Sequence, residues 1–211
     1  MSEDSARQEA IARFALGCFW GPDARFGLVD GVTRTRVGYA GGTTPSPTYD
    51  HIGDHAETLE VAYDPEVVDY PQLIQVFFAA HDSTRPSPRR QYASIIFPED
   101  DEQEDRALEA LRNLSEEAGK PPATEVLRSQ VFHSAEAYHQ KFYLQQVRRI
   151  FDSLRRQYDD LWELVDSRPA ARINGYIAGY GNIEDLEEEI DEMNLDPGGK
   201  DALLRLVRSR S

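Results

Sequence analysis

The sequence contains a single cysteine, Cys18, among 211 residues. One cysteine cannot form a disulfide within the chain, so no oxidative cross-link is available to stabilise the fold. No apolar run approaches the roughly 20 residues that a membrane-spanning helix needs. The polar, acidic stretch 1–10 does not have the form of a signal peptide. We therefore expect a soluble protein that works in the cytoplasm.

Positive charge is also scarce. The chain has 23 lysine and arginine residues, of which only three are lysines, against 38 aspartate and glutamate residues, and its formal charge is −15. A field of this sign repels nucleic acid phosphates and anionic lipids, so neither nucleic acid nor a membrane is expected as a partner. The acidic runs 99–105 and 184–192 are typical of solvated helix faces. A docking surface for a partner protein on the C-terminal run is the alternative.

The only cysteine lies in the segment Gly17-Cys18-Phe19-Trp20-Gly21. Residues 12–16 before it have the pattern of a short strand, and Pro22 after it suits the first turn of a helix. Cys18 is therefore expected where a strand ends and a helix begins, where the helix dipole favours the thiolate. A lone buried cysteine can also be an inert small hydrophobic residue. The flanking glycines and aromatic residues favour a nucleophile, because a core strand gains nothing from them.

Strand and helix patterns alternate along the first three quarters of the chain. Strands are predicted at 32–40, 57–63 and 92–97, with short ones at 124–127 and 131–132, and helices at 69–80, 99–118 and 134–151. Several connections are too short for parallel crossovers, so we expect an α+β two-layer sandwich over residues 1–160, which form the catalytic domain. Residues 161–211 are helical in pattern throughout and are expected to form an accessory C-terminal helical extension.

Glu57 is the first residue on the otherwise apolar face of the strand predicted at 57–63. A buried charge without a partner is costly, and desolvation raises the pKa of such a carboxyl group. Glu57 is thus either an exposed carboxylate at a strand edge or a proton donor that stays neutral near pH 7. A metal site is a further possibility, with His51 and His55 as two ligands and Glu57 as the third. Gly53 argues against the helix that their spacing needs and no further ligand cluster follows, so no metal is expected.

Short motifs follow one another in a fixed order along residues 12–145. They are the pentapeptide 17–21, Val37-Gly-Tyr39-Ala-Gly-Gly42, Pro47-Thr-Tyr49, His55-Ala-Glu57, Val61-Ala-Tyr-Asp-Pro65, Gln91-Tyr92-Ala-Ser94 and Ala135-Glu-Ala-Tyr-His-Gln140. In sequence and order they resemble the A-type peptide methionine sulfoxide reductases. The resemblance implies a ferredoxin-like version of the α+β sandwich and no bound cofactor. It also implies an enzyme that reduces methionine S-sulfoxide, free or in proteins, to methionine.

The resemblance further implies roles for individual residues. Cys18 is similar to the family's nucleophile, Phe19 and Trp20 to the apolar cradle of the substrate methyl group, and Glu57 to the acid. The residue types agree with the chemistry, because a sulfoxide sulfur accepts a thiolate only if its oxygen is protonated as it leaves. The product on the enzyme is then a sulfenic acid on Cys18.

Tyr39 and Tyr92 resemble the family hydroxyls that hold the sulfoxide oxygen. A tyrosine hydroxyl suits this task because it donates a hydrogen bond without adding a charge. Both residues could equally be core aromatic residues whose hydroxyls are satisfied within the protein.

The sequence departs from the family pattern in three places. The loop before Gln91 is shortened, and Ser87 stands where an aspartate is usual; Pro22-Asp23 replaces the glutamate that commonly follows the pentapeptide. The recycling cysteines near the C-terminus are absent, so an external thiol reductant such as thioredoxin, or glutathione with glutaredoxin, is expected as a partner. The shortened loop leaves an alternative open, namely a catalytically weak relative that binds a sulfoxide or senses peroxide through Cys18.

Overall fold

The computed structural model describes residues 9–128 and 131–210, which form an α+β structure around one sheet. Within these residues six strands are found, in the order β5-β4-β1-β3-β2-β6. Neighbouring strands are antiparallel except for the parallel pair β4 and β5. The strands are β1 (Ala10–Leu16), β2 (Val32–Ala40), β3 (Ala56–Tyr63), β4 (Ser94–Phe97), β5 (Glu125–Val126) and β6 (His133–Ser134). Residues 1–8, on which part of the signal-peptide expectation rests, lie outside the described residues.

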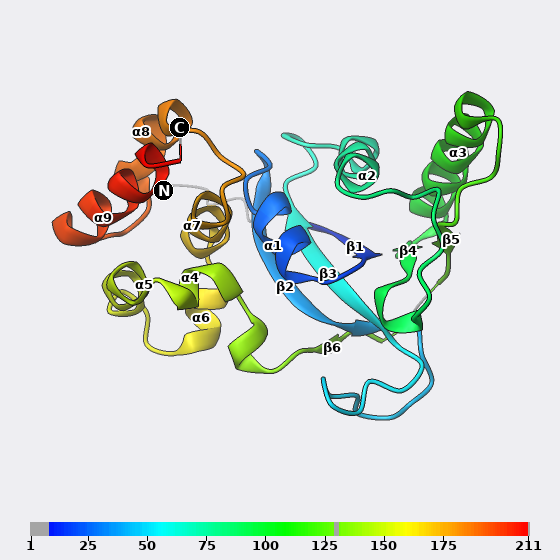
Figure 1. The fold of residues 1–211 in the computed structure, drawn as a ribbon, viewed down its shortest axis with the longest axis horizontal. Coiled ribbons are helices and arrows are strands. Elements are labelled where there is room, and N and C mark those ends of the chain that lie inside the picture. Colours follow the sequence, from blue (N-terminus) through cyan, green and yellow to red (C-terminus); the bar gives the residue numbers. More distant parts are fainter. Residues whose placement is uncertain (1–8, 129–130, 211) are drawn as a thin grey trace, which may run out of the picture.

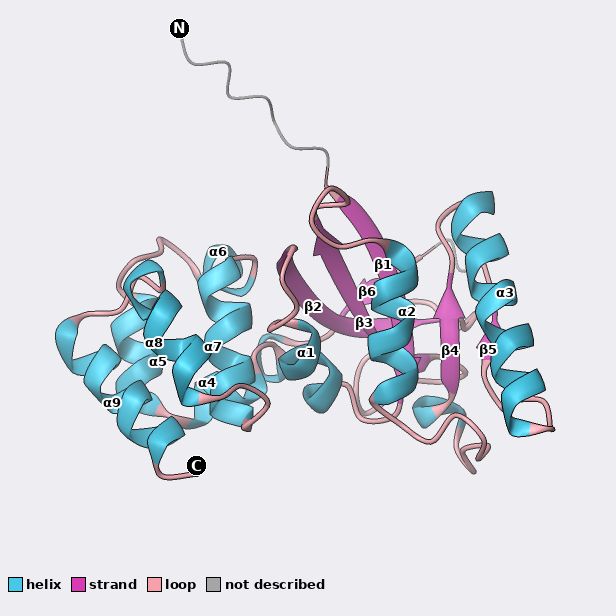
Figure 2. Ribbon diagram, turned by 90° about the horizontal axis from the view of Figure 1, so that it is seen from above, coloured by secondary structure: helices cyan, strands magenta, loops and turns pink. Residues whose placement is uncertain are grey.

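The helices fall into two groups (Figure 1). α1 (Trp20–Phe26) and α2 (Tyr70–Ala79) lie on the sheet, and α3 (Asp101–Ala118) lies beside α2 at the edge of the sheet formed by β5. The later helices gather on the opposite side, and the view from above shows the same division (Figure 2). They are α4 (Phe142–Gln146), α5 (Arg148–Arg155), α6 (Leu161–Val165), α7 (Arg168–Ala178), α8 (Ile183–Glu189) and α9 (Pro197–Arg208), with single 3₁₀ turns at Arg90–Tyr92, Ala137–His139 and Ile190–Glu192.

Two hydrophobic cores correspond to these two groups. The first lies between the sheet and helices α1 and α2, where Phe14 of β1 packs against Phe26 and Phe77. The second lies within the later helices and includes Leu144 and Ile150 in addition to residues beyond 161. None of the helices in the described parts of the chain combines the length and the apolar character required to cross a bilayer.

Several local predictions are confirmed because short-range chemistry determines them. β2 has the predicted bounds, and the strand expected at 57–63 is β3 with one added residue. The α2 helix begins with a reciprocal capping box, in which the Asp69 carboxylate accepts from the Gln72 N–H and the Gln72 side chain accepts from the Asp69 N–H. Gly119 ends α3 in the left-handed conformation, as its position predicts.

The long helix predicted at 134–151 is wrong. The segment contains β6, a 3₁₀ turn, α4 and α5, and Lys141 at its centre has a left-handed backbone with φ of 49°. Tertiary hydrogen bonds override the local pattern: the Gln140 side chain bonds the backbone of Val37 in both directions, and Lys141 Nζ bonds Asp23 Oδ1 at 2.9 Å. Two smaller predictions also fail, since β4 begins at Ser94 rather than at residue 92 and the short strand lies at 133–134 rather than 131–132.

Candidate active site

Cys18 lies in the short connection between β1 and α1, where the sequence pattern places it. Gly17 has φ of 97°, a conformation that residues with a side chain rarely adopt, and it turns the chain out of the sheet. The thiol is exposed to solvent, whereas Phe19 directly after it is 1% exposed. The structure therefore excludes the interpretation of Cys18 as an inert core residue.

Glu57 lies on β3 in the protein interior, 1% exposed. Its Oε2 accepts a hydrogen bond from the Phe19 N–H at 3.1 Å, and its Oε1 accepts one from Gln91 Nε2 at 2.7 Å. Burial raises the pKa of Glu57 above its ordinary value, and these two hydrogen bonds oppose the rise without cancelling it. The alternative of an exposed strand-edge carboxylate is therefore wrong, and Glu57 is a carboxyl group with an increased tendency to hold a proton.

The thiol and the carboxyl group influence each other's ionisation. Burial raises the pKa of Cys18, the Trp20 N–H at the start of α1 lowers it, and the negative charge of Glu57 raises it further, with a net rise. The hydrogen bond from the Trp20 N–H is the expected effect of the helix start on the Cys18 pKa, but it is smaller than the effect of burial. Because each negative charge disfavours the other, the pair holds one proton over a wider pH range than two independent groups would.

Tyr39 lies in the core rather than in the solvent-accessible part of the site. It is fully buried, and its hydroxyl donates to Glu136 Oε2 at 2.8 Å. Burial and this neighbouring carboxylate raise the pKa of Tyr39 far above its ordinary value. The alternative that the sequence left open, a core tyrosine with a satisfied hydroxyl, describes this residue.

Tyr49 occupies the position beside Cys18 and Glu57 for which sequence reasoning named Tyr39. It is partly exposed, its hydroxyl hydrogen-bonds that of Tyr92, and burial, followed by the proximity of Tyr92 and Glu57, raises its pKa. The backbone N–H of Tyr49 donates to Glu136 Oε1 at 2.9 Å. The motif Pro47-Thr-Tyr49 was the available signal, but it carried no assigned role.

Trp20 and His139 form an aromatic wall next to Cys18. Trp20 stacks on Phe142 with ring centroids 3.7 Å apart, and its Nε1 donates to His139 Nδ1 at 3.2 Å. Burial lowers the pKa of His139, and since the indole N–H can only donate, the neutral ring carries its proton on Nε2. That atom is buried and has no hydrogen-bond partner within the described residues. Phe19 closes the wall from the inside, 5.2 Å from the His139 ring.

Two residues that the sequence singled out lie outside this group. Ser87, at the position of the usual aspartate, is in an exposed loop and its hydroxyl donates to the Arg89 carbonyl at 2.9 Å. His55 accepts from the Gly42 N–H through Nδ1 and bonds the Thr44 carbonyl through Nε2, so both ring nitrogens are engaged within the protein. Across the described residues no group of three or more histidine, cysteine, aspartate or glutamate side chains is arranged to hold a metal ion.

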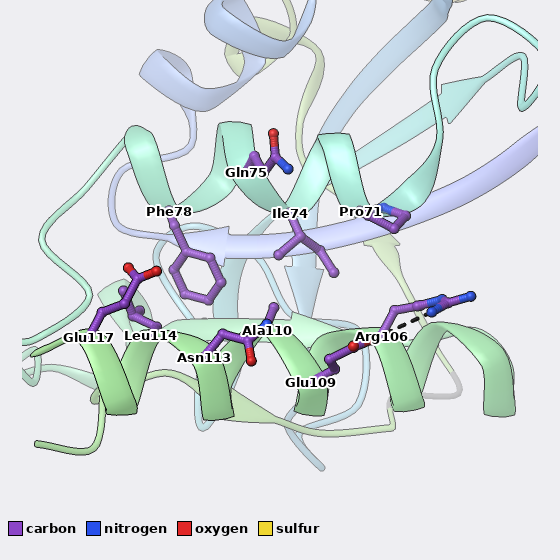
Figure 3. A pocket seen from close by; sticks show the side chains of 10 residues that line it. All are labelled: Pro71, Ile74, Gln75, Phe78, Arg106, Glu109, Ala110, Asn113, Leu114 and Glu117. Atoms are coloured by element: carbon purple, nitrogen blue, oxygen red, sulfur yellow. Dashed lines mark hydrogen bonds and ion pairs between the residues drawn. The ribbon is translucent and has the colours of Figure 1, made fainter. Parts of the chain in front are cut away.

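A separate groove of about 570 Å³ lies between α2 and α3 (Figure 3). Ile74 and Phe78 of α2 point toward Ala110 on α3, and Arg106 pairs with Glu109 at 3.4 Å. No cysteine, histidine or tyrosine lines the groove, so it offers neither a nucleophile nor a proton donor of the kind found around Cys18. The candidate active site is therefore the open junction at Cys18.

Comparison with known proteins identifies the family to which the chain belongs. Residues 10–161 match the family model of peptide methionine sulfoxide reductase, and residues 159–197 match that of the helical domain of selenoprotein methionine sulfoxide reductase A. The chain is 40% identical over 193 residues to the peptide methionine sulfoxide reductase of Drosophila melanogaster, covering 90% of this chain and 76% of the relative. It is 38% identical over 183 residues to peptide methionine sulfoxide reductase A5 of Arabidopsis thaliana, covering 84% and 70%.

Solved structures give the same answer. The reduced form of Mxr1 from Saccharomyces cerevisiae superposes with a TM-score of 0.62 at 28% identity, covering 70% of this chain and 90% of that one. Methionine sulfoxide reductase A of Corynebacterium diphtheriae superposes with a TM-score of 0.58 at 28% identity, covering 67% and 76%. Fold and site thus define an oxidoreductase that acts on a sulfur group. The chain belongs to the A-type peptide methionine sulfoxide reductase family and is a peptide-methionine (S)-S-oxide reductase.

Proposed function

We propose that the Cys18 thiolate attacks the sulfur of methionine S-sulfoxide, free or in proteins, while Glu57 protonates the departing oxygen. The oxygen atom is transferred to Cys18: the substrate sulfur gains two electrons, and the thiol becomes a sulfenic acid. The observation that carries this proposal is an exposed thiol coupled electrostatically to a buried carboxyl group with a raised pKa. A neutral carboxyl group is what a leaving oxygen needs.

One proton is enough to serve both groups. With a total of one proton, the pair exists mainly as thiol and carboxylate, and the reactive thiolate with carboxylic acid is its minor tautomer. The rise in the pKa of both Cys18 and Glu57 shifts the pH range of this singly protonated state upward from that of an ordinary thiol and carboxyl group. When substrate displaces water from the thiol, movement of the proton from sulfur to carboxylate generates nucleophile and acid together.

Two tyrosine hydroxyls near Cys18 and Glu57 suit the sulfoxide oxygen of the substrate. We assign its hydrogen bonds to the hydroxyls of Tyr92 and Tyr49, since these bond each other and Tyr49 lies near Glu57 and Cys18. Tyr39 is then a support, because Glu136 accepts from its hydroxyl and from the Tyr49 backbone N–H at once. Phe19 and Trp20 are assigned to the apolar cradle of the substrate methyl group; of the two, Trp20 is the one with solvent-exposed surface.

The remaining expectations concern recycling, location and architecture. With one cysteine in the chain, the sulfenic acid at Cys18 requires an external thiol, of the thioredoxin or glutathione type, and such thiols are abundant in a reducing cytoplasm. The order β4-β1-β3-β2, with α1 and α2 as crossovers, supports a ferredoxin-like core. The two family models meet at residues 159–161, which supports a catalytic domain at 1–160 and a helical extension at 161–211. Leu144 and Ile150 nevertheless pack in the core of the later helices.

The test is turnover of separated S and R sulfoxides with dithiothreitol, measured as methionine formed. We expect reduction of the S form alone and none by Cys18→Ser, whose hydroxyl is not ionised at neutral pH. Mass spectrometry of the substrate-treated enzyme without reductant should find one added oxygen on Cys18. Continued turnover by Cys18→Ser would show that the nucleophile is another group.

Peroxide sensing through Cys18 is the competing function for the same residue. Peroxides react with thiolates, and the raised pKa of Cys18 keeps the free enzyme mostly in the thiol form at neutral pH. The same thiolate is needed by the reductase, so the support for the reductase over the sensor comes from the family matches and from Glu57, which can take the proton of the thiol.

A further inference from the structure

The helical extension is fixed against the helix that follows the nucleophile. α1 and α7 run antiparallel, and a side-chain carbon at Gly27 or Gly175 would overlap the facing backbone of α7 or α1, respectively. Asn174 on α7 donates to Asp23 Oδ2 at 3.1 Å, so a polar contact adds to the close packing. The end of α7 is thereby held in a defined position relative to Cys18.

The turn after α7 brings Tyr180 to the start of α1. A side-chain carbon built at Gly21 would lie 3.3 Å from the Tyr180 hydroxyl, and the Tyr180 ring remains 43% exposed. Tyr143, whose pKa is raised mainly by burial, lies close enough to both Tyr180 and Cys18 for their ionised forms to raise it further. Tyr180 is therefore a solvent-facing side chain of the extension at the rim of the site.

Arg25 is the cationic group at this rim. Its guanidinium lies over the Tyr180 ring, 4.5 Å from the centroid. Most arginines of this acidic chain pair with a carboxylate. Within the described residues, no carboxylate pairs with Arg25. Stacking covers one face of a guanidinium and leaves the N–H groups along its edge free to bind a carboxylate in two-point geometry.

The distance to the thiol suits a methionine substrate. Arg25 follows Cys18 by seven residues, and the helical rise from Trp20 to Arg25 in α1 accounts for about 8 Å of their separation along the axis. A helical side chain leans back toward the N-terminal end, here toward the thiol. In a methionine sulfoxide the carboxyl carbon lies four bonds from sulfur, about 5 Å away, and one further residue adds up to about 3.5 Å. A carboxylate on the substrate residue itself or on its neighbour therefore comes within reach of Arg25 when sulfur meets Cys18.

We propose that Arg25, held by Tyr180 of the helical extension, forms a subsite for a carboxylate that lies next to the sulfoxide residue in the substrate. The carboxylate can be the α-carboxylate of the substrate residue or an acidic side chain beside it in a peptide. This proposal rests on the proposed reductase function and adds a preference within it. The extension then contributes directly to substrate selection rather than only to stability.

The test compares paired substrates that differ only in charge. One arm uses the S-sulfoxide of N-acetylmethionine against its methylamide, and the other uses Ac-Met(O)-Glu-NH₂ against Ac-Met(O)-Gln-NH₂. The measured quantity is the ratio of kcat/KM within each pair. We expect the wild type to favour the carboxylate about fivefold at low salt in at least one arm, the size of a partly exposed ion pair, and less at high salt. The arm that shows the preference identifies the source of the carboxylate.

Variants separate binding from scaffolding. Arg25→Gln should bring the ratio to about one, Tyr180→Leu should lower it part of the way, and the control Arg112→Gln, exposed on the distant α3, should leave it at the wild-type value. A wild-type ratio of one in both arms, or equal loss on charged and neutral substrates in Arg25→Gln, would overturn the subsite. Absence of turnover with all four substrates would instead reject the proposed function, and the subsite with it.

Discussion

Substitution of Glu57 by glutamine should move the two properties of the site in opposite directions. Glutamine keeps the shape of the side chain, and its carbonyl oxygen can still accept from the Phe19 N–H, which needs an acceptor in the interior. The new NH₂ group then faces Gln91, whose amide can turn to present its oxygen. The fold of the site is therefore preserved while its proton donor and its negative charge are lost.

The two effects have separate magnitudes. A positioned general acid contributes typically about 10²- to 10⁴-fold to a rate, or about 3–5 kcal/mol of activation free energy, and kcat/KM for the S-sulfoxide should fall by about this factor. The pKa of Cys18 should fall as well, because the Glu57 charge that raises it is gone, although burial still acts on it. Alkylation of the thiol at neutral pH should consequently become faster.

The assay measures methionine formation with dithiothreitol and, on the same preparations, the rate of iodoacetamide alkylation against pH. Glu109→Gln, on the exposed side of α3, serves as a matched control that should change neither. Turnover of Glu57→Gln within threefold of the wild type would refute the role of Glu57 as the acid. A shift of the alkylation profile to higher pH would refute the electrostatic coupling.

The other predictions concern the tyrosines, the pH profile and the buried ion pair. Tyr49→Phe should lower kcat/KM at least tenfold with little loss of stability, whereas Tyr39→Phe should lower the free energy of unfolding in urea by about 1.5–3 kcal/mol, since it removes a buried hydrogen bond to a carboxylate; the reverse pattern would restore Tyr39 as the catalytic hydroxyl. kcat/KM should rise with pH as the pair of acid and thiol loses its first proton, at a pKa above that of an ordinary glutamate, and fall as it loses the second, at a pKa above the ordinary thiol value. A rate that still increases at pH values well above the ordinary thiol pKa would contradict a proton-donating carboxyl group. Lys141→Met leaves the buried Asp23 carboxylate without its cation and should cost about 3–5 kcal/mol, or about 10 °C in Tm; addition of Asp23→Asn should recover part of the loss, and a fully additive double variant would show that the two groups do not interact.

The elements that short-range chemistry determines could be predicted from the sequence. The strand–helix junction that exposes Cys18 follows from a strand pattern, two glycines and a proline, and the burial of Glu57 follows from its place in an apolar row. The capping box at Asp69 is similarly local. What was predictable was therefore the exposure of Cys18, the burial of Glu57 and most of the sheet.

The features that depend on distant parts of the chain could not be predicted. The helix break at Lys141 is caused by the Asp23 carboxylate, 118 positions earlier. The choice between Tyr39 and Tyr49 depends on Glu136, which accepts from the hydroxyl of Tyr39 but only from the backbone N–H of Tyr49. Helical periodicity in residues 99–118 predicts that Leu108 faces inward, and this prediction is wrong: Leu108 of α3 is 38% exposed, because α3 packs at the edge of the sheet and buries only a narrow stripe. Periodicity gives a helix its apolar side but not the extent to which that side is covered.

The contact between Asp23 and Asn174 has a consequence for synthesis of the protein. The two residues are 151 positions apart, so at about 5–20 residues per second the ribosome needs about 8–30 s to deliver the second after the first. During that interval the nascent chain already exposes its thiol, but the helix beside it lacks its amide partner and its packing against Gly175. Cys18 is therefore among the first residues of this enzyme to be made, whereas the packing around the helix beside it is among the last to be completed.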